Sequence, residues 1–94
     1  MHLATLTLEI QIPGCTSLKQ KRSRLKPLLA QIHKQFNVSA AEIGQNDMHT
    51  LAHVAVVVVS NDGRHAESML AKIPAWIEMR RPDLTILDHH IRRF

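Results

Sequence analysis

Aromatic residues, cysteine and long apolar runs are scarce in this sequence. Aromatic residues make up 3% of the chain and tyrosine is absent, so a core must be built from aliphatic side chains. The single cysteine, Cys15, excludes an internal disulfide bond and any metal site of several cysteines, and it fits a reducing compartment. The apolar run VAVVVV at 54–59 is far too short to span a membrane. The N-terminus lacks the pattern of a signal peptide, so we expect a cytoplasmic protein.

Negative charge is missing from one long stretch of the chain. No acidic residue stands between Glu9 and Glu42. The same interval holds six basic residues: Lys19, Lys21, Arg22, Arg24, Lys26 and Lys34. The rest of the chain has six basic and eight acidic residues, a net charge of −2 within a total of +4. The positive charge therefore belongs to one segment, which predicts either a solvated helix face or a surface for a polyanionic partner.

The pattern of apolar residues predicts four strands. Residues 3–12 alternate between apolar and polar, which is typical of a half-buried strand. Residues 49–60 are apolar on both faces, as expected of a central strand. Residues 37–43 and 84–91 are the two remaining strand candidates, and the sequence GQND at 44–47 favours a turn.

Two segments have the spacing of an amphipathic helix. The first begins after the N-cap candidate Ser17 and stops near Asn37. The second begins after the N-cap candidate Asp62 and ends in RRPD at 80–83. The expected buried stripes are Leu18, Leu25, Leu29, Ile32 and Phe36 in the first helix, and Ala66, Met69, Leu70, Ile73, Trp76 and Ile77 in the second.

A proline interrupts each helical pattern. Pro27 lies about opposite the first apolar stripe, so the carbonyl of Ser23 that it leaves without a partner can face water. We therefore expect one bent helix there rather than two. Pro74 interrupts the second pattern in the same way, and the sequence leaves open whether it bends or breaks the helix.

The order strand, helix, strand, strand, helix, strand defines the fold class. It predicts one α+β domain over residues 1–94 with the ferredoxin-like βαββαβ topology. Two right-handed crossovers would place both helices on one face of a four-stranded antiparallel sheet. The other face of the sheet would remain open.

Three segments carry a resemblance to a known family. IPGCTSLKQKR at 12–22, FNVSAAEI at 36–43 and VVVVSNDGRHAESML at 56–70 resemble the YlxP-like family of small bacterial proteins of unknown function. The resemblance implies a ferredoxin-like fold and a cytoplasmic protein whose gene often lies among genes for translation and ribosome maturation. It implies no catalytic residues. The sequence departs from the usual pattern at three positions, Cys15, Pro27 and Pro74.

The histidines do not form a metal-binding pattern. His49 and His53 are expected on or beside a strand, where four residues span about 13 Å, too far for one ion. His89 and His90 are adjacent on a strand and point to opposite faces. No HExxH motif is present. We expect no metal and no cofactor.

Nucleophilic catalysis is not expected either. Ser60, Asp62 and His65 lie close together in the sequence, but Asp62 is better explained as a helix cap and Ser60 as part of a turn. Cys15 follows the first strand and precedes a helix, which leaves two interpretations, a reactive thiol or a small neutral core residue, and the second is the simpler. We expect a protein that is not an enzyme.

The first helix is the remaining candidate for a binding surface. Lys19, Arg22, Lys26 and His33 share a sector of about 60°. The residues predicted to contact nucleic acid are Lys19, Lys21, Arg22, Arg24, Lys26 and His33, which suit contacts to a phosphate backbone without base reading. Base stacking on the open sheet face is excluded, because its expected residues, such as Thr5 and Glu9, include no aromatic side chain. RNA or the ribosome is the predicted partner.

The open sheet face predicts a homo-oligomer. The residues expected there are Thr5, Thr7, Ala55, Val57 and Val59, an apolar patch that a second copy could cover. Long side chains such as Arg92 or Gln45 could shield it instead. Two alternative functions remain: a dimeric small-molecule-binding or regulatory module, and a structural interaction protein without a ligand.

Overall fold

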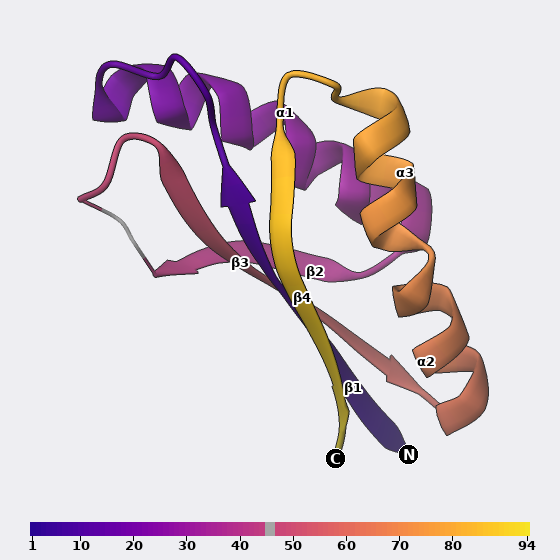
Figure 1. Cartoon of the computed structure of the whole chain (residues 1–94). Helices are drawn as coiled ribbons and strands as arrows, with labels where there is room; N and C mark the ends of the chain where they lie inside the picture. The colour runs from indigo at the N-terminus through magenta and orange to yellow at the C-terminus, as the bar shows by residue number, and fades with distance from the viewer. Residues whose placement is uncertain (45–46) are drawn as a thin grey trace.

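The computed structural model describes residues 1–44 and 47–94. Along the chain the elements are β1 (His2–Gln11), α1 (Leu18–Phe36), β2 (Ser39–Gly44), β3 (Leu51–Ser60), α2 (Gly63–Ala71), α3 (Ile73–Arg80) and β4 (Thr85–Arg93) (Figure 1). The predicted turn at 44–47 includes residues 45–46, which lie outside the described residues.

The four strands form one antiparallel sheet in the order β2-β3-β1-β4. This order, with helices in the two crossovers, confirms the predicted ferredoxin-like fold. The termini lie side by side at one end of the sheet, where the Phe94 amide donates to the Leu3 carbonyl at 2.8 Å (Figure 1). β1 and β3 occupy the centre of the sheet, so their side chains have neighbours on both sides.

The core lies on one face of the sheet. Leu6, Leu8 and Ile10 of β1 are fully buried, as the alternation in the sequence predicts. They pack in one cluster with aliphatic residues of both helical segments, among them Ile32 and Leu70. The helices therefore cover the same face. The largely aliphatic interior follows from the scarcity of aromatic residues.

α1 forms as a single helix across Pro27. Ser17 Oγ accepts a hydrogen bond from the Gln20 amide at 3.1 Å and so caps the first turn. Asn37 ends the helix in the left-handed region, at φ 52°. Pro27 is exposed, so water can reach the carbonyl that its missing N–H leaves without a partner. The prediction of one helix rather than two is confirmed.

The buried side of α1 differs from the predicted stripe. Leu25, Leu28 and Ile32 are buried, whereas Leu29 and Phe36 are only partly buried. The expected stripe omitted Leu28, and its centre lay to one side of the helix face that is buried against the core. The difference matters for the charged residues, because it changes which of them face the core.

The second helical pattern forms two helices. Asp62 caps α2 by accepting from the amides of Arg64 and His65 at 3.0 and 3.2 Å. The helix ends at Ala71, and α3 begins at Ile73 with Pro74 in its first turn. A first-turn amide has no partner within its own helix, so proline costs nothing at that position. Pro74 therefore breaks the pattern, while Pro27 does not.

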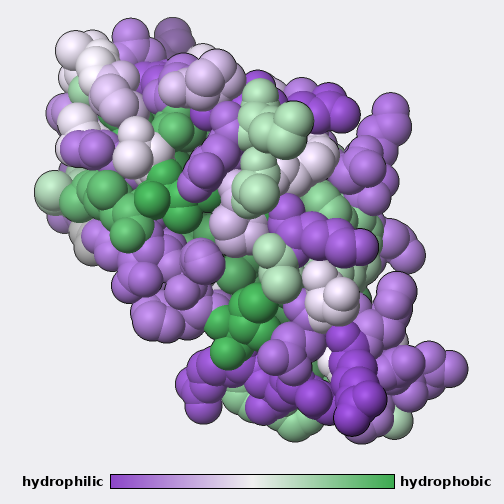
Figure 2. All heavy atoms as spheres, turned by 45° about the vertical axis from the view of Figure 1, so that its right-hand side comes forward, coloured by the Kyte–Doolittle hydropathy of each residue, from purple (hydrophilic) through white to green (hydrophobic). Residues whose placement is uncertain are grey.

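Hydrophobic side chains also reach the surface. Figure 2 shows them in several groups separated by hydrophilic side chains on the face in view. Large apolar side chains that are exposed include Val59, Met79 and Phe94. Within the described residues, none of the helices has both the length and the hydropathy to cross a membrane.

Candidate nucleic-acid interface

The basic residues of α1 fall into an outward and an inward group. We call Lys19, Arg22 and Lys26 the outward cations. All three are exposed, and at about 100° per residue they share a sector of about 60°. Among the described residues, no acidic side chain lies within ion-pair distance of any of them. Their side chains can therefore contact a ligand without a change in the fold.

Lys21 lies in the core, contrary to the prediction that it contributes to an exposed surface. It is 1% exposed. Its Nζ lies 2.7 Å from Glu42 Oε2 and donates a hydrogen bond to the Met48 carbonyl at 2.8 Å. The ion pair joins α1 to β2. A signal for this burial exists in the sequence, since Lys21 precedes Leu25, Leu28 and Ile32 by four, seven and eleven residues, on the line of the buried contact.

Arg24 is also engaged within the fold. Its guanidinium donates to the Pro13 carbonyl at 2.8 Å, and to the carbonyl and carboxylate of Asp83 at 3.1 and 3.2 Å. Arg81 binds the same carboxylate at 2.9 and 3.0 Å, and it donates to the Arg24 carbonyl at 3.1 Å. Arg24 therefore links α1 to two loops. Its charge is paired with Asp83 and is not available to a ligand.

The two arginines of this cluster change the pKa of Asp83. The Arg81 guanidinium, by its hydrogen bonds, lowers the pKa of the Asp83 carboxyl from 3.8 to about 2. Burial opposes this shift, and Arg24 adds to it. Asp83 thus stays ionised at any pH near neutral and keeps both arginines in place.

His33 lies on the outward side of α1 and is exposed. Its Nδ1 donates to the Val38 carbonyl just after the end of the helix. The bond leaves Nε2 directed away from that carbonyl. Of the six predicted residues, the structure thus brings Lys19, Arg22, Lys26 and His33 together on one side and places Lys21 and Arg24 elsewhere.

A groove between α1 and α3 extends the basic surface, and it was not foreseen from the sequence. It has a volume of about 440 Å³ and is lined by Gln31, Lys34, Gln35, Trp76 and Arg80. The Arg80 guanidinium lies over the Trp76 ring, with Cζ 5.3 Å from its centroid. Trp76 and Arg80 are four residues apart on one helix, a spacing that could have pointed to this pair.

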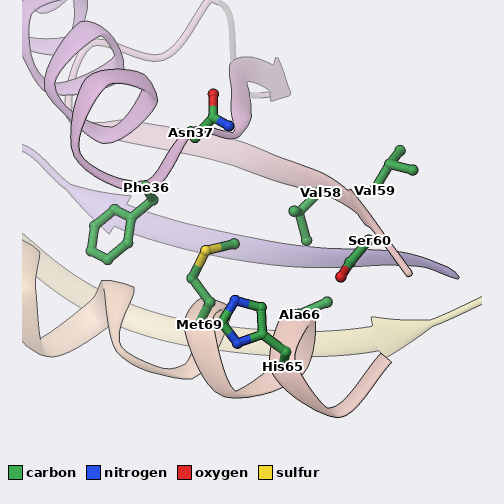
Figure 3. Close-up of a pocket in the computed structure, with 8 residues that line it drawn as sticks. All are labelled: Phe36, Asn37, Val58, Val59, Ser60, His65, Ala66 and Met69. Carbon is green, nitrogen blue, oxygen red and sulfur yellow. The ribbon is translucent and has the colours of Figure 1, made fainter. Parts of the chain in front are cut away.

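The Ser60, Asp62 and His65 group lies at the end of β3 and the start of α2. It borders a pocket of about 300 Å³ in which His65 and Met69 of α2 face Phe36 of α1 (Figure 3). Ser60 Oγ accepts from the Asp62 amide at 3.0 Å, while the Asp62 carboxylate caps α2. Both side chains therefore support the local backbone.

The remaining reactive side chains are placed as follows. Cys15 is buried, and its thiol donates to the Ser17 carbonyl at 3.4 Å, which suits a small core residue. His53 and Glu9 are cross-strand neighbours on β3 and β1. Among residues 1–44 and 47–94, no three His, Cys, Asp or Glu side chains are grouped so as to hold a metal ion.

The five predicted interface residues of the sheet share its open face. Thr5 pairs with Val57 and Thr7 with Ala55 in the central register. Val59 is 61% exposed, and the other four are partly exposed. Arg92 of β4 pairs with Thr5 of β1. The Arg92 guanidinium lies over the Phe94 ring, with Cζ 5.1 Å from the ring centroid. Gln45, the other predicted shield, lies outside the described residues.

These observations define a ferredoxin-like domain with a cationic helix on one layer and an open sheet face on the other. The family model for a protein of unknown function, DUF503, matches residues 3–91, and the chain belongs to this family. The chain is 36% identical over 62 residues to the "Uncharacterized protein YlxP" of Bacillus subtilis (strain 168). That match covers 66% of this chain and 67% of the relative, and it confirms the resemblance.

Proposed function

We propose that this protein is a non-enzymatic module that binds the phosphate backbone of RNA through the outward cations of α1. The observation that carries the proposal is the exposure of Lys19, Arg22 and Lys26 on one side of a single capped helix, with no acidic partner among the described residues. RNA is our choice of polyanion because the resemblance to the YlxP-like family implies a gene among those for translation and ribosome maturation.

The spacing of the outward cations suits a backbone contact. Lys19 and Lys26 are seven residues apart, about 10 Å along the helix axis. Arg22 lies between them and can bind a phosphate with two hydrogen bonds. The helix is fixed to the sheet through its buried side, so the backbone that carries the cations loses little freedom on binding. Such contacts position a nucleic acid but carry no base specificity.

Matched pairs of variants test this proposal. Arg22→Ala with Lys26→Ala should weaken binding of a labelled single-stranded RNA and lower the salt slope of the affinity by about 1.4, since each lost contact removes about 0.7. Adding Lys19→Ala should lower the slope again by about 0.7. The control, Arg64→Ala with Lys72→Ala, removes the same charge from exposed positions on α2 and its C-cap.

The control pair should keep the wild-type salt slope. Equal losses in the two pairs would mean that only net charge matters, and the proposal would then fail. Absence of RNA binding by the wild-type protein at low salt would also overturn it. Urea unfolding of each variant checks that the fold is retained, since exposed substitutions of this kind change stability by about 0.5 kcal/mol or less.

We also propose that a second copy of the chain covers the open sheet face. The exposed side of β3 carries Val57 and Val59, with Thr5 and Thr7 beside them. Two residues of opposite charge lie on the same face of β4: Asp88, level with Glu9, and Arg92, level with Thr5. A two-fold axis across the strands near Thr7 would set Arg92 against Asp88 of the partner subunit, so the patch is complementary to itself.

Sedimentation equilibrium tests the dimer. Wild-type protein at micromolar concentration should have a mass near twice the 10.7 kDa of the chain. Val57→Lys should give a monomer, because it places an unpaired charge in the apolar part of the interface. Met79→Lys is the control, since Met79 is an 85% exposed apolar residue on α3, away from the open face. A monomeric wild type would overturn this second proposal and leave the RNA proposal intact.

A further inference from the structure

The groove between α1 and α3 combines features that do not occur together elsewhere on the described surface. Its five lining residues bring two positive charges, two amides and one indole, and none of them is acidic. Among the described residues, neither Lys34 nor Arg80 has an acidic side chain within ion-pair distance. The groove is thus a concave and cationic site with a flat aromatic surface.

Trp76 is held in place from two sides. Phe36 meets it edge to face, with ring centroids 5.3 Å apart and planes at 81°. Arg80 lies over its ring, as one turn of α3 brings it there. Trp76 is partly buried against the core, whereas Arg80 is exposed. The pair therefore forms a supported platform whose outer member, a planar guanidinium, is open to a ligand.

The cations of α1 lead toward this groove. At about 100° per residue, Arg22, Lys26 and Lys34 lie at successively larger angles around the helix, about 40° and then about 80° apart. Gln31 and Gln35, which line the groove, lie further round in the same direction. An RNA strand that follows the outward cations along α1 would therefore reach the groove about 12 Å beyond Lys26, measured along the helix axis.

We propose that the groove holds one nucleotide of a single-stranded RNA, with its base stacked on the Arg80–Trp76 platform and a phosphate on Lys34. Gln31 and Gln35 each carry a donor and an acceptor, which can meet the polar edge of a base. Stacking on aromatic or guanidinium planes is sequence-tolerant, because every base has a flat face. The inference rests on the proposed RNA binding and adds that the bound RNA is single-stranded.

The chain contains its own probe for this site. Trp76 is the single tryptophan and tyrosine is absent, so the fluorescence of the protein comes from one residue that lines the groove. Titration with a single-stranded RNA decamer should quench it. Two ligands of the same charge, an abasic decamer and inorganic polyphosphate, should bind in a competition assay but leave the fluorescence unchanged, because they have no base to stack.

A substitution on the platform tests whether the position of this cation, and not only the net charge of the protein, matters for binding. Arg80→Gln should reduce RNA affinity about fivefold or more and weaken the quenching, because it removes both the outer plane and one cation. Its control, Arg64→Gln, removes an exposed cation on α2 and should leave both signals as in the wild type. Trp76 itself packs on the core, so Arg80 is the safer position to change.

The outcomes distinguish this inference from the proposed function. If neither RNA nor polyphosphate binds at low salt, the proposed function itself fails. If RNA binds with the expected dependence on Arg22 and Lys26 but leaves Trp76 fluorescence unchanged, only the groove is excluded. Equal quenching by RNA and by the abasic decamer, or wild-type RNA affinity in Arg80→Gln, would likewise overturn base stacking.

Discussion

The two sides of α1 differ in the exposure and pairing of their basic residues. Lys21 and Lys26 are five residues apart on one helix, yet Lys21 is 1% exposed and paired with Glu42, while Lys26 is exposed and has no acidic partner among the described residues. Arg24 takes an intermediate position, since it is partly buried and bound to the exposed Asp83. A run of basic residues therefore need not be a basic surface, because distant acidic residues can neutralise part of it.

The comparison predicts its largest effect at Lys21. Lys21→Met keeps the apolar stem but removes the ammonium group, so Glu42 loses its partner and the Met48 carbonyl loses its donor. We expect the free energy of unfolding to fall by about 2–4 kcal/mol, because breaking one side of a buried ion pair leaves the other charge uncompensated. Urea unfolding measures this loss.

Lys26→Met is the matched control, with the same change of side chain on the outward side. It should alter the unfolding free energy by about 0.5 kcal/mol or less. The salt slope for RNA should show the reverse pattern, because it should fall for Lys26→Met and stay constant for Lys21→Met. Equal stability of the two variants would show that the two sides of α1 do not differ as described.

A smaller effect is expected at the Arg24–Asp83 contact. The pKa of Asp83 is lowered to about 2, so the carboxylate contributes stability at pH values above its unfolded pKa of 3.8, and this contribution disappears as the pH falls toward 2. Its size should be about 1 kcal/mol or less, because the Asp83 side chain is 41% exposed.

Asp83→Asn tests this contribution. The variant should be slightly less stable than wild type at neutral pH, and the difference should close between about pH 4 and pH 2. Thermal unfolding across this range, with Asp47→Asn as a control at an exposed acidic residue, measures it. A constant difference at every pH would mean that the ionised carboxylate is not what Arg24 and Arg81 stabilise.

The smallest effect is expected at Pro27, on the exposed side of α1. Pro27→Ala restores a helical N–H and replaces a poor helix former with a good one. Stability should stay the same or rise by about 1 kcal/mol in chemical unfolding. A decrease of more than about 1 kcal/mol would show that the helix needs the proline for its packing, and Pro27 would then belong functionally with the inward residues.

Most of the fold was predictable because its signals are local. The alternation in 3–12 and the apolar segment 49–60 marked the two central strands, and Ser17 and Asp62 marked both helix starts correctly. The break at Pro74 was not decided, because a proline within a helical pattern is compatible with either a kink or a new first turn. The burial of Leu28 was missed because the apolar residues of this helix cover a wide arc.

The sequence by itself determined the order of the elements, the segment that carries the positive charge and the apolar residues of the open sheet face. These properties depend on the periodicity of neighbouring residues and on their composition. Only the tertiary structure decided which cations remain available. Glu42 reaches Lys21 from β2, and Asp83 reaches Arg24 across 59 residues of sequence. The same holds for the groove, since Lys34 and Trp76 become neighbours only when α1 and α3 pack on the same sheet face. Such pairings depend on chain topology and not on local spacing, so no pattern within one segment reveals them.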